Sequence, residues 1–293
     1  MSSLLLVYFT GILRAVNLPK VIWPVVSLLI GVAPNLFGHG DVHLRIQAIT
    51  QQIAQSQDAR TNASLYFQRA DLYRTDGDWT NALADLDRVA QLDSSLKRVD
   101  YLRGLVQFEA NHLDAALASL NKYLASKPKD YEAFAARARV FVKLGSYRAA
   151  VEDYTTAIGL SAPSPDLFIE RADACRALGK PEEGLRSLDE GIRKIGQPLV
   201  TLELPAVDLE ISLKNYDAAL ARIDRVMARV QRKETWLARR AEILRQAGRE
   251  DEAQKNYREA LAAIEQLPAA HRSTRAMAEL QARVQTALIN IKK

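Results

Sequence analysis

The chain has 293 residues, of which 48% are hydrophobic and 26% charged, a composition typical of folded globular domains. Its formal net charge of +5 is spread over interspersed acidic and basic residues, without the basic stripe and interleaved aromatics that nucleic-acid binding requires. We therefore expect no nucleic-acid partner. The single cysteine, Cys175, excludes an intrachain disulfide, and we interpret it as a small buried hydrophobe.

Residues 1–38 differ in composition from the rest of the chain. They contain no Asp or Glu and only two basic residues. The apolar run from Val21 to Ala33 has the length of a signal-peptide core, and small residues follow it. We expect export to the periplasm with cleavage near Gly38. The alternative is that residues 1–37 form a membrane anchor facing the periplasm, because an uncleaved stretch of this length is marginally able to span a bilayer.

Residues 41–62 predict an N-terminal capping helix and a linker. Asp41 is placed to cap this helix, and its apolar side chains share one face. That face consists of Val42, Ile46, Ile49 and Ile53. His39 and His43, our candidate metal ligands, stand at its start. If cleavage leaves His39 as the first residue, its amine and imidazole chelate copper, so a copper-handling envelope protein is one alternative hypothesis.

From residue 63 the chain repeats itself about every 34 residues, in blocks at 63–96, 97–130, 131–164, 165–199, 200–233 and 234–266. One series of mostly small residues marks the blocks: Ala70, Gly104, Ala138, Ala172, Val207 and Ala241. A second series keeps the same register: Ala82, Ala116, Ala150, Gly184, Ala219 and Ala253. A fixed period in this range is the signature of a solenoid.

The third block shows the expected local structure. Phe134, Ala138 and Phe141 are three to four residues apart, so they share one helix face. Gly145 is suited to end that helix, because glycine readily adopts positive φ after a last turn. A second helix is predicted to begin near Tyr147. A single pair of this kind buries too little surface to be stable, so neighbouring pairs must stack.

The blocks resemble the tetratricopeptide repeat, whose pattern is W-x₂-L-G-x₂-Y, then A-x₃-F, then Pro. The third block supplies Phe134, Ala138, Phe141, Gly145, Ala150 and Tyr154 at the matching places. The resemblance implies an all-α, right-handed solenoid of about six helix pairs with N- and C-terminal capping helices. In this family the first helices of the repeats line a concave groove that binds a protein or peptide.

The fifth block departs most from the pattern. Pro205 falls within its first helix, which we therefore expect to be shortened or kinked, and Lys214 replaces the glycine of its turn. At the end of the chain, residues 270–293 predict a closing helix capped by Ser273. The apolar side of that helix is formed by Met277, Leu280, Val284, Leu288 and Ile291.

The sequence offers no catalytic motif: it has no HExxH or CxxC spacing, no Gly-rich phosphate loop and no GxSxG elbow. We therefore expect neither enzyme activity nor a cofactor. Arginine recurs just before the first small series, at Arg69, Arg103, Arg137, Arg171 and Arg240. Such a ladder is suited to bind phosphates or carboxylates. Acids on the second helices, at Asp85, Asp153 and Glu190, favour a structural role instead.

By resemblance, ten first-helix residues are our candidate partner-binding positions: Phe67, Asp71, Arg74, Arg98, Tyr101, Leu105, Phe108, Arg139, Asp173 and Arg176. Aromatics flanked by arginine suit a protein-binding hot spot, although a covering N-terminal helix would make them core. Some family members clamp a carboxylate with lysines and asparagines of the first repeats. Here Phe67, Asp71 and Tyr101 hold those places, which argues against such a clamp. We expect a non-catalytic scaffold or adaptor, with a membrane-tethered envelope assembly factor as a further alternative.

Overall fold

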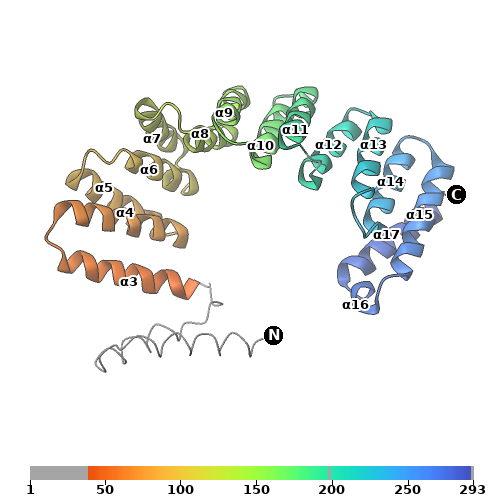
Figure 1. Cartoon of the computed structure of the whole chain (residues 1–293), viewed down its shortest axis with the longest axis horizontal. Helices are drawn as coiled ribbons and strands as arrows, with labels where there is room; N and C mark the ends of the chain where they lie inside the picture. The colour runs from red at the N-terminus through yellow and green to blue at the C-terminus, as the bar shows by residue number, and fades with distance from the viewer. Residues whose placement is uncertain (1–38, 197–198, 292–293) are drawn as a thin grey trace, which may run out of the picture.

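A computed structural model describes residues 39–196 and 199–291 of the chain. These residues form helices and connecting turns, without strands. Figure 1 shows the helices following one another along an arch, with α3 at one end and α15 and α17 at the other. The predicted export signal or anchor, at 1–38, lies outside the described residues.

The helices alternate with short connections along the chain. Their bounds are α3 (His39–Gln55), α4 (Ala59–Asp76), α5 (Trp79–Leu92), α6 (Arg98–Glu109), α7 (Leu113–Ser126), α8 (Tyr131–Lys143), α9 (Tyr147–Leu160), α10 (Pro165–Ala177), α11 (Pro181–Ile195), α12 (Val200–Ser212), α13 (Tyr216–Met227), α14 (Glu234–Gln246), α15 (Glu250–Glu265), α16 (Ala269–Arg272) and α17 (Arg275–Ile291). Six pairs, α4–α5 to α14–α15, pack as helical hairpins, while α3 packs on α4 and α17 packs on α14 and α15. The predicted all-α solenoid of six helix pairs is confirmed.

A left-handed residue follows the first helix in each of the six pairs. These residues are Gly77, Asn111, Gly145, Gly179, Lys214 and Gly248. The next residue in each turn donates its N–H to a carbonyl five positions back, as Ser146 does to Phe141 (2.8 Å) and Asn215 does to Glu210 (2.8 Å). This hydrogen bond gives a partner to one of the last carbonyls of the helix, which have no N–H partner within the helix itself. The fifth pair therefore keeps the turn of the others although Lys214 stands at the glycine position.

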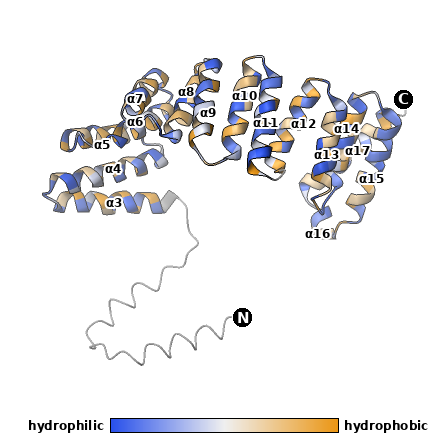
Figure 2. Ribbon diagram, turned by 45° about the horizontal axis from the view of Figure 1, so that its top comes forward, coloured by the Kyte–Doolittle hydropathy of each residue, from blue (hydrophilic) through white to orange (hydrophobic). Residues whose placement is uncertain are grey.

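The two series of small residues lie where the paired helices approach most closely. Ala70, Ala138 and Ala150 are completely buried. A Cβ added to Gly184 of α11 would stand 2.8 Å from the carbonyl oxygen of Ala172 in α10, so the two backbones touch there. Larger side chains such as Tyr154 and Phe168 fill the space beside these contacts. Figure 2 shows hydrophobic and hydrophilic residues interspersed along the helices of the arch.

Two predicted helix starts are wrong by a few residues. Helix α3 begins at His39, so Asp41 lies in its first turn, where a carboxylate favours the helix dipole, instead of capping it. Ser273 ends the short helix α16, and the closing helix α17 begins at Arg275. The hydrophobic side of α17 is as predicted, with Met277, Leu280 and Val284 buried against the last pair.

The predicted shortening of the fifth first helix is also wrong. Helix α12 has 13 residues, as α8, α10 and α14 do, and it continues through Pro205. Proline removes one backbone donor from the helix. Burial of Leu202, Ala206 and Leu209 on both sides of it holds the helix in place.

Candidate protein-binding groove

Three of the five recurring arginines join the first and second helices of their own repeats, whereas Arg103 pairs with Asp87 and Arg240 with Asp224 of the preceding repeat. Arg69 forms two hydrogen bonds with Asp85, both 2.7 Å, and Arg137 forms two with Asp153, at 2.7 and 2.8 Å. Arg171 donates to Ser187 (2.9 Å) and to Glu190. Because these guanidinium groups are committed to acids and hydroxyls of their own repeats, they stabilise the solenoid. The structural role predicted for them is confirmed.

In the fifth repeat the buried arginine lies on the second helix and its acidic partners on the first. The place of the recurring arginine is taken by Ala206, and the buried guanidinium belongs to Arg222 on the second helix α13. Arg222 contacts Glu203 (3.3 Å) and Glu210 (3.4 Å) of α12 and Asp189 (2.8 Å) of α11. The 34-residue series of arginines skips this repeat, so the sequence alone did not predict the cluster.

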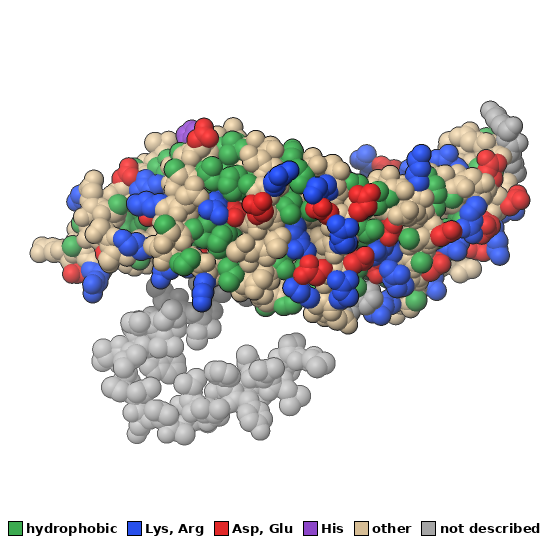
Figure 3. All heavy atoms as spheres, turned by 90° about the horizontal axis from the view of Figure 1, so that it is seen from above, with side chains coloured by type: hydrophobic (Ala, Val, Ile, Leu, Met, Phe, Trp, Pro, Cys, Tyr) green, Lys and Arg blue, Asp and Glu red, His purple; other side chains and the backbone are tan. Residues whose placement is uncertain are grey.

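The first helices line the inner side of the arch in Figure 1. Successive first helices contact one another there: α4 contacts α6, α6 contacts α8, α10 contacts α12, and α14 contacts the closing helix α17. We call this inner side the concave face. The candidate positions on α4, α6, α8 and α10 belong to it. Figure 3 views the arch from above, where basic and acidic side chains are interspersed.

The predicted apolar patch of Phe67, Tyr101, Leu105 and Phe108 is partly core. All four side chains are half-buried, and each packs against the hydrophobic clusters of the first three repeats. The Tyr101 ring lies 5.4 Å from that of Tyr123, and burial raises the pKa of its hydroxyl. The patch thus presents one side to the concave face while the other side stabilises the fold.

Charged side chains on the concave face pair across successive first helices. Four ion pairs do so: Arg74–Glu109 (2.6 Å), Arg98–Glu132 (3.8 Å), Arg139–Glu170 (2.9 Å) and Arg239–Asp208 (2.5 Å). Asp71 contacts Arg74 on its own helix, and Asp173 likewise contacts Arg176. The four pairs join α4 to α6, α6 to α8, α8 to α10, and α12 to α14. Within the described residues, the steps from α10 to α12 and from α14 to α17 have no such pair.

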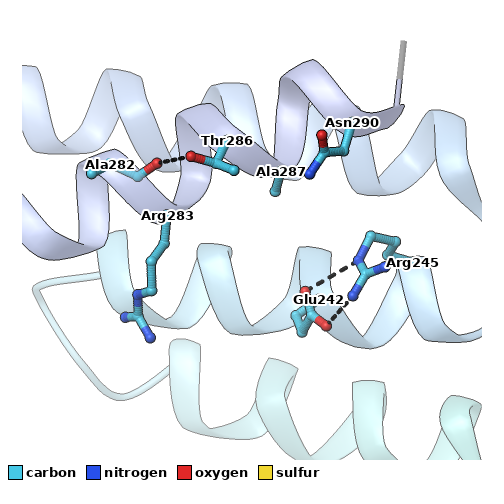
Figure 4. Close-up of a pocket in the computed structure, with 7 residues that line it drawn as sticks. All are labelled: Glu242, Arg245, Ala282, Arg283, Thr286, Ala287 and Asn290. Carbon is cyan, nitrogen blue, oxygen red and sulfur yellow. Dashed lines mark hydrogen bonds and ion pairs between the residues drawn. The ribbon is translucent and has the colours of Figure 1, made fainter. Parts of the chain in front are cut away.

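Recesses lie at these two steps. The first, which we call the central recess, has a largely apolar floor that includes Ile169, Leu188 and Leu209. Its rim carries Asp173, Arg176, Asp208 and Ser212. Two of the ten candidate positions, Asp173 and Arg176, are therefore brought together at a recess of the concave face. The second, which we call the terminal recess, lies between α14 and α17 (Figure 4).

The described residues offer no cluster of side chains that supports the predicted metal site. Over residues 39–196 and 199–291, no three His, Cys, Asp or Glu side chains gather as metal ligands do. His43 lies on α3 with its Nδ1 3.6 Å from a carboxylate oxygen of Asp76. The side chain of His39 and a free amine at that position lie outside the description. Among the helices described, none is both long and apolar enough to cross a membrane.

The stacked hairpins and their concave face define a helical-repeat solenoid of the protein-binding class. Residues 67–131 and 135–197 match the tetratricopeptide repeat family. The remaining pairs continue the same hairpin and the same left-handed turn. Residues 67–197 of the chain thus carry tetratricopeptide repeats, and the helix pairs that follow have the same fold.

Solved structures share this fold at low sequence identity. A tetratricopeptide repeat protein from Parabacteroides merdae is 17% identical, with a TM-score of 0.53 over 84% of this chain and 93% of its own. PilF of Pseudomonas aeruginosa is 16% identical, with a TM-score of 0.52 over 77% and 99%. The Naa15/Naa10 complex bound to HypK gives a TM-score of 0.51 at 14% identity, over 85% of this chain and 36% of the other. No curated protein matches the chain.

Proposed function

We propose that the protein is a non-catalytic scaffold that binds a segment of another protein along its concave face. The observation that carries this proposal is the central recess between α10 and α12. This recess offers both an apolar floor and charged groups at the rim. Protein-binding hot spots combine these features, because an anchoring side chain is desolvated in the pocket and polar contacts surround it.

The chemistry of the central recess suits an apolar anchor residue. Ile169 and Leu209 supply apolar walls from the two facing helices, and Pro205 of α12 also lines the recess. Asp173 and Arg176 are 59% and 65% exposed, and their partnership within one helix turn is of the weak surface kind. Both are therefore available to exchange that contact for backbone or side-chain groups of a bound segment.

A pair of double variants tests the proposal. Arg176→Glu with Ser212→Arg changes the rim and fills the recess, and both residues are exposed, so the core is untouched. Arg186→Glu with Thr155→Arg makes the same changes on the exposed faces of the second helices α11 and α9. Partners that copurify with the wild-type protein are measured in all three. We expect them to be lost from the first variant and retained by the second.

Two results contradict the concave-face proposal. One is unchanged capture by the Arg176→Glu and Ser212→Arg protein, and the other is equal loss in both variants. Far-UV circular dichroism and the melting temperature of each variant show whether the solenoid is intact. A variant that melts as the wild type does and has lost its partner locates binding at the recess.

We propose further that this scaffold works outside the cytoplasm. The support is the sequence of residues 1–38, with its apolar run and absence of acidic residues. The intact mass of the protein from fractionated cells tests this. A mass that begins near His39 in the soluble periplasmic fraction supports export with cleavage. A full-length mass that resists carbonate extraction supports the membrane-tethered alternative, and a full-length mass in the cytoplasmic fraction contradicts both.

A further inference from the structure

The terminal recess lies between α14, the first helix of the sixth pair, and the closing helix α17. Figure 4 shows Arg283, Ala287 and Asn290 extending from α17 toward Glu242 and Arg245 on α14. Its inner wall is apolar, with Ala238 of α14 and Leu280 and Val284 of α17. The recess thus joins an apolar surface to a set of charged side chains.

The residues that line the terminal recess carry a net positive charge. Three arginines line it: Arg239, Arg245 and Arg283. Its single acid is Glu242. Arg239 is paired with Asp208 outside the recess lining, and Arg245 is paired with Glu242. Among the residues that the structure describes, Arg283 is the arginine of this recess without a counterion.

Glu242 cannot neutralise Arg283 because its oxygens are already used. They accept hydrogen bonds from Arg245 (2.7 Å), from the Tyr257 hydroxyl (2.8 Å) and from Gln246 (3.2 Å). Burial alone would raise the pKa of Glu242, but these hydrogen bonds lower it, so the group is held ionised. Over residues 39–196 and 199–291, Arg283 has neither a hydrogen bond nor an ion pair from its side chain.

We infer that the terminal recess binds an acidic peptide segment, with a Glu or Asp carboxylate on Arg283 and an adjacent apolar side chain against the half-buried Ala287, in front of the buried Leu280 and Val284. Arginine suits this role because its planar guanidinium presents paired donors to a carboxylate. The inference rests on the proposed function and deepens it, because it names the chemistry of one place in the groove. The ligand places a negative charge where the solenoid has an excess positive one.

A short peptide tests this without knowledge of the natural partner. The probe is a fluorescein-labelled (Glu-Leu)₃ peptide, and its uncharged counterpart is (Gln-Leu)₃, both titrated against the full chain at physiological salt. We expect the glutamate peptide to bind and the glutamine peptide to bind about tenfold more weakly or not at all, because a charge-assisted hydrogen bond is lost.

Two single variants separate the recess from general charge attraction. Arg283→Gln removes the proposed ligand, and we expect the affinity for (Glu-Leu)₃ to fall about tenfold. Arg275→Gln removes an equal charge from the same helix, at a side chain that is 93% exposed and paired with Glu279. The control is expected to keep the wild-type affinity.

Three results overturn the inference: equal binding of the two peptides, equal loss in the two variants, or displacement of the peptide by an equal concentration of inorganic phosphate. The Arg176→Glu and Ser212→Arg protein distinguishes this inference from the proposed function. If that variant loses its cellular partner and still binds (Glu-Leu)₃, both stand. If it keeps its partner while Arg283→Gln loses the peptide, the central-recess proposal fails and the terminal recess stands.

Discussion

Glu203 of α12 and Arg222 of α13 form a buried ion pair, with 3.3 Å between a carboxylate oxygen and a guanidinium nitrogen. The Glu203 side chain is 1% exposed, and that of Arg222 is 8% exposed. Arg225 adds a second contact to Glu203 at 3.1 Å from a more exposed position. In a dry environment, two charges are stable only together, since each alone carries the full cost of desolvation.

The first prediction concerns this pair. Arg222→Met removes the ion-pair partner of the buried Glu210 and one of the two partners of Glu203, and we expect a loss of about 3–5 kcal/mol in the free energy of unfolding. Arg225→Met serves as the control. Its side chain is 47% exposed, so we expect a loss of about 1 kcal/mol or less. Urea denaturation measures both, and equal losses would contradict the special role of Arg222.

The second prediction concerns the left-handed turn at Lys214. Its φ of 60° is a conformation that disfavours side chains with a Cβ, and five further turns show the same geometry. We expect Lys214→Gly to stabilise the protein by about 1 kcal/mol, because glycine adopts this φ without the steric cost. Lys214→Ala keeps the Cβ and is expected to change stability little. Thermal melting of the two variants compares them directly, and a gain in the alanine variant would refute the explanation.

The third prediction uses two glycines within helices. Gly184→Ala in α11 places a methyl group against the Ala172 carbonyl oxygen, so we expect destabilisation of roughly 1–3 kcal/mol. At Gly159 of α9 an added Cβ meets nothing within 4 Å. There the same change is expected to stabilise by roughly 0.5–1 kcal/mol, since alanine is the better helix former. Opposite signs in a chemical denaturation series confirm the close approach of α10 and α11.

The fourth prediction is a dependence on alkaline pH. Burial, and then the hydrogen bond to Glu242, raises the pKa of Tyr257 from 10 to about 12. A raised folded-state pKa gives stability that is present below the unfolded pKa and lost as pH rises through the folded one. We expect the free energy of unfolding to fall between about pH 10 and 12. Tyr257→Phe lacks this contribution and is expected to show a shallower decline. Identical slopes would show that Tyr257 does not cause the effect.

The fold could be predicted from the sequence because only small residues fit where two helix backbones come into close contact. The approach of α11 to α10 admits only a small residue at Gly184, and the same restriction at the other pairs produces the 34-residue period. The inner stripe of α17 was predictable for a similar reason, since Met277, Leu280 and Val284 must share one face. Helix starts were less predictable, because Asp41 and Ser273 are equally suited to a cap, a first turn or a helix end.

The recesses were beyond sequence reasoning for a different reason. Their positions depend on which charges pair across helices about one repeat apart, as Arg139 does with Glu170. Both residues have other charged neighbours along the chain, so the sequence does not select the pair. Arg283 likewise becomes a candidate ligand only when α17 is seen to lie beside α14. The candidate positions Asp173 and Arg176 followed from the resemblance to the repeat family, whereas Pro205 and Asp208, which line the same recess, did not.

The most direct test of concave-face binding is site-specific photocrosslinking in cells. A benzophenone side chain is placed at Arg176 or Asp208, on the rim of the central recess, and at Arg186 or Thr155, on the second helices. The side chains of Arg176, Asp208 and Arg186 are 65%, 63% and 71% exposed. The recess positions and this second-helix position are therefore about equally accessible to a partner. We expect one partner to crosslink from both recess positions and from neither second-helix position. Crosslinks to that partner from the second helices alone would contradict the account.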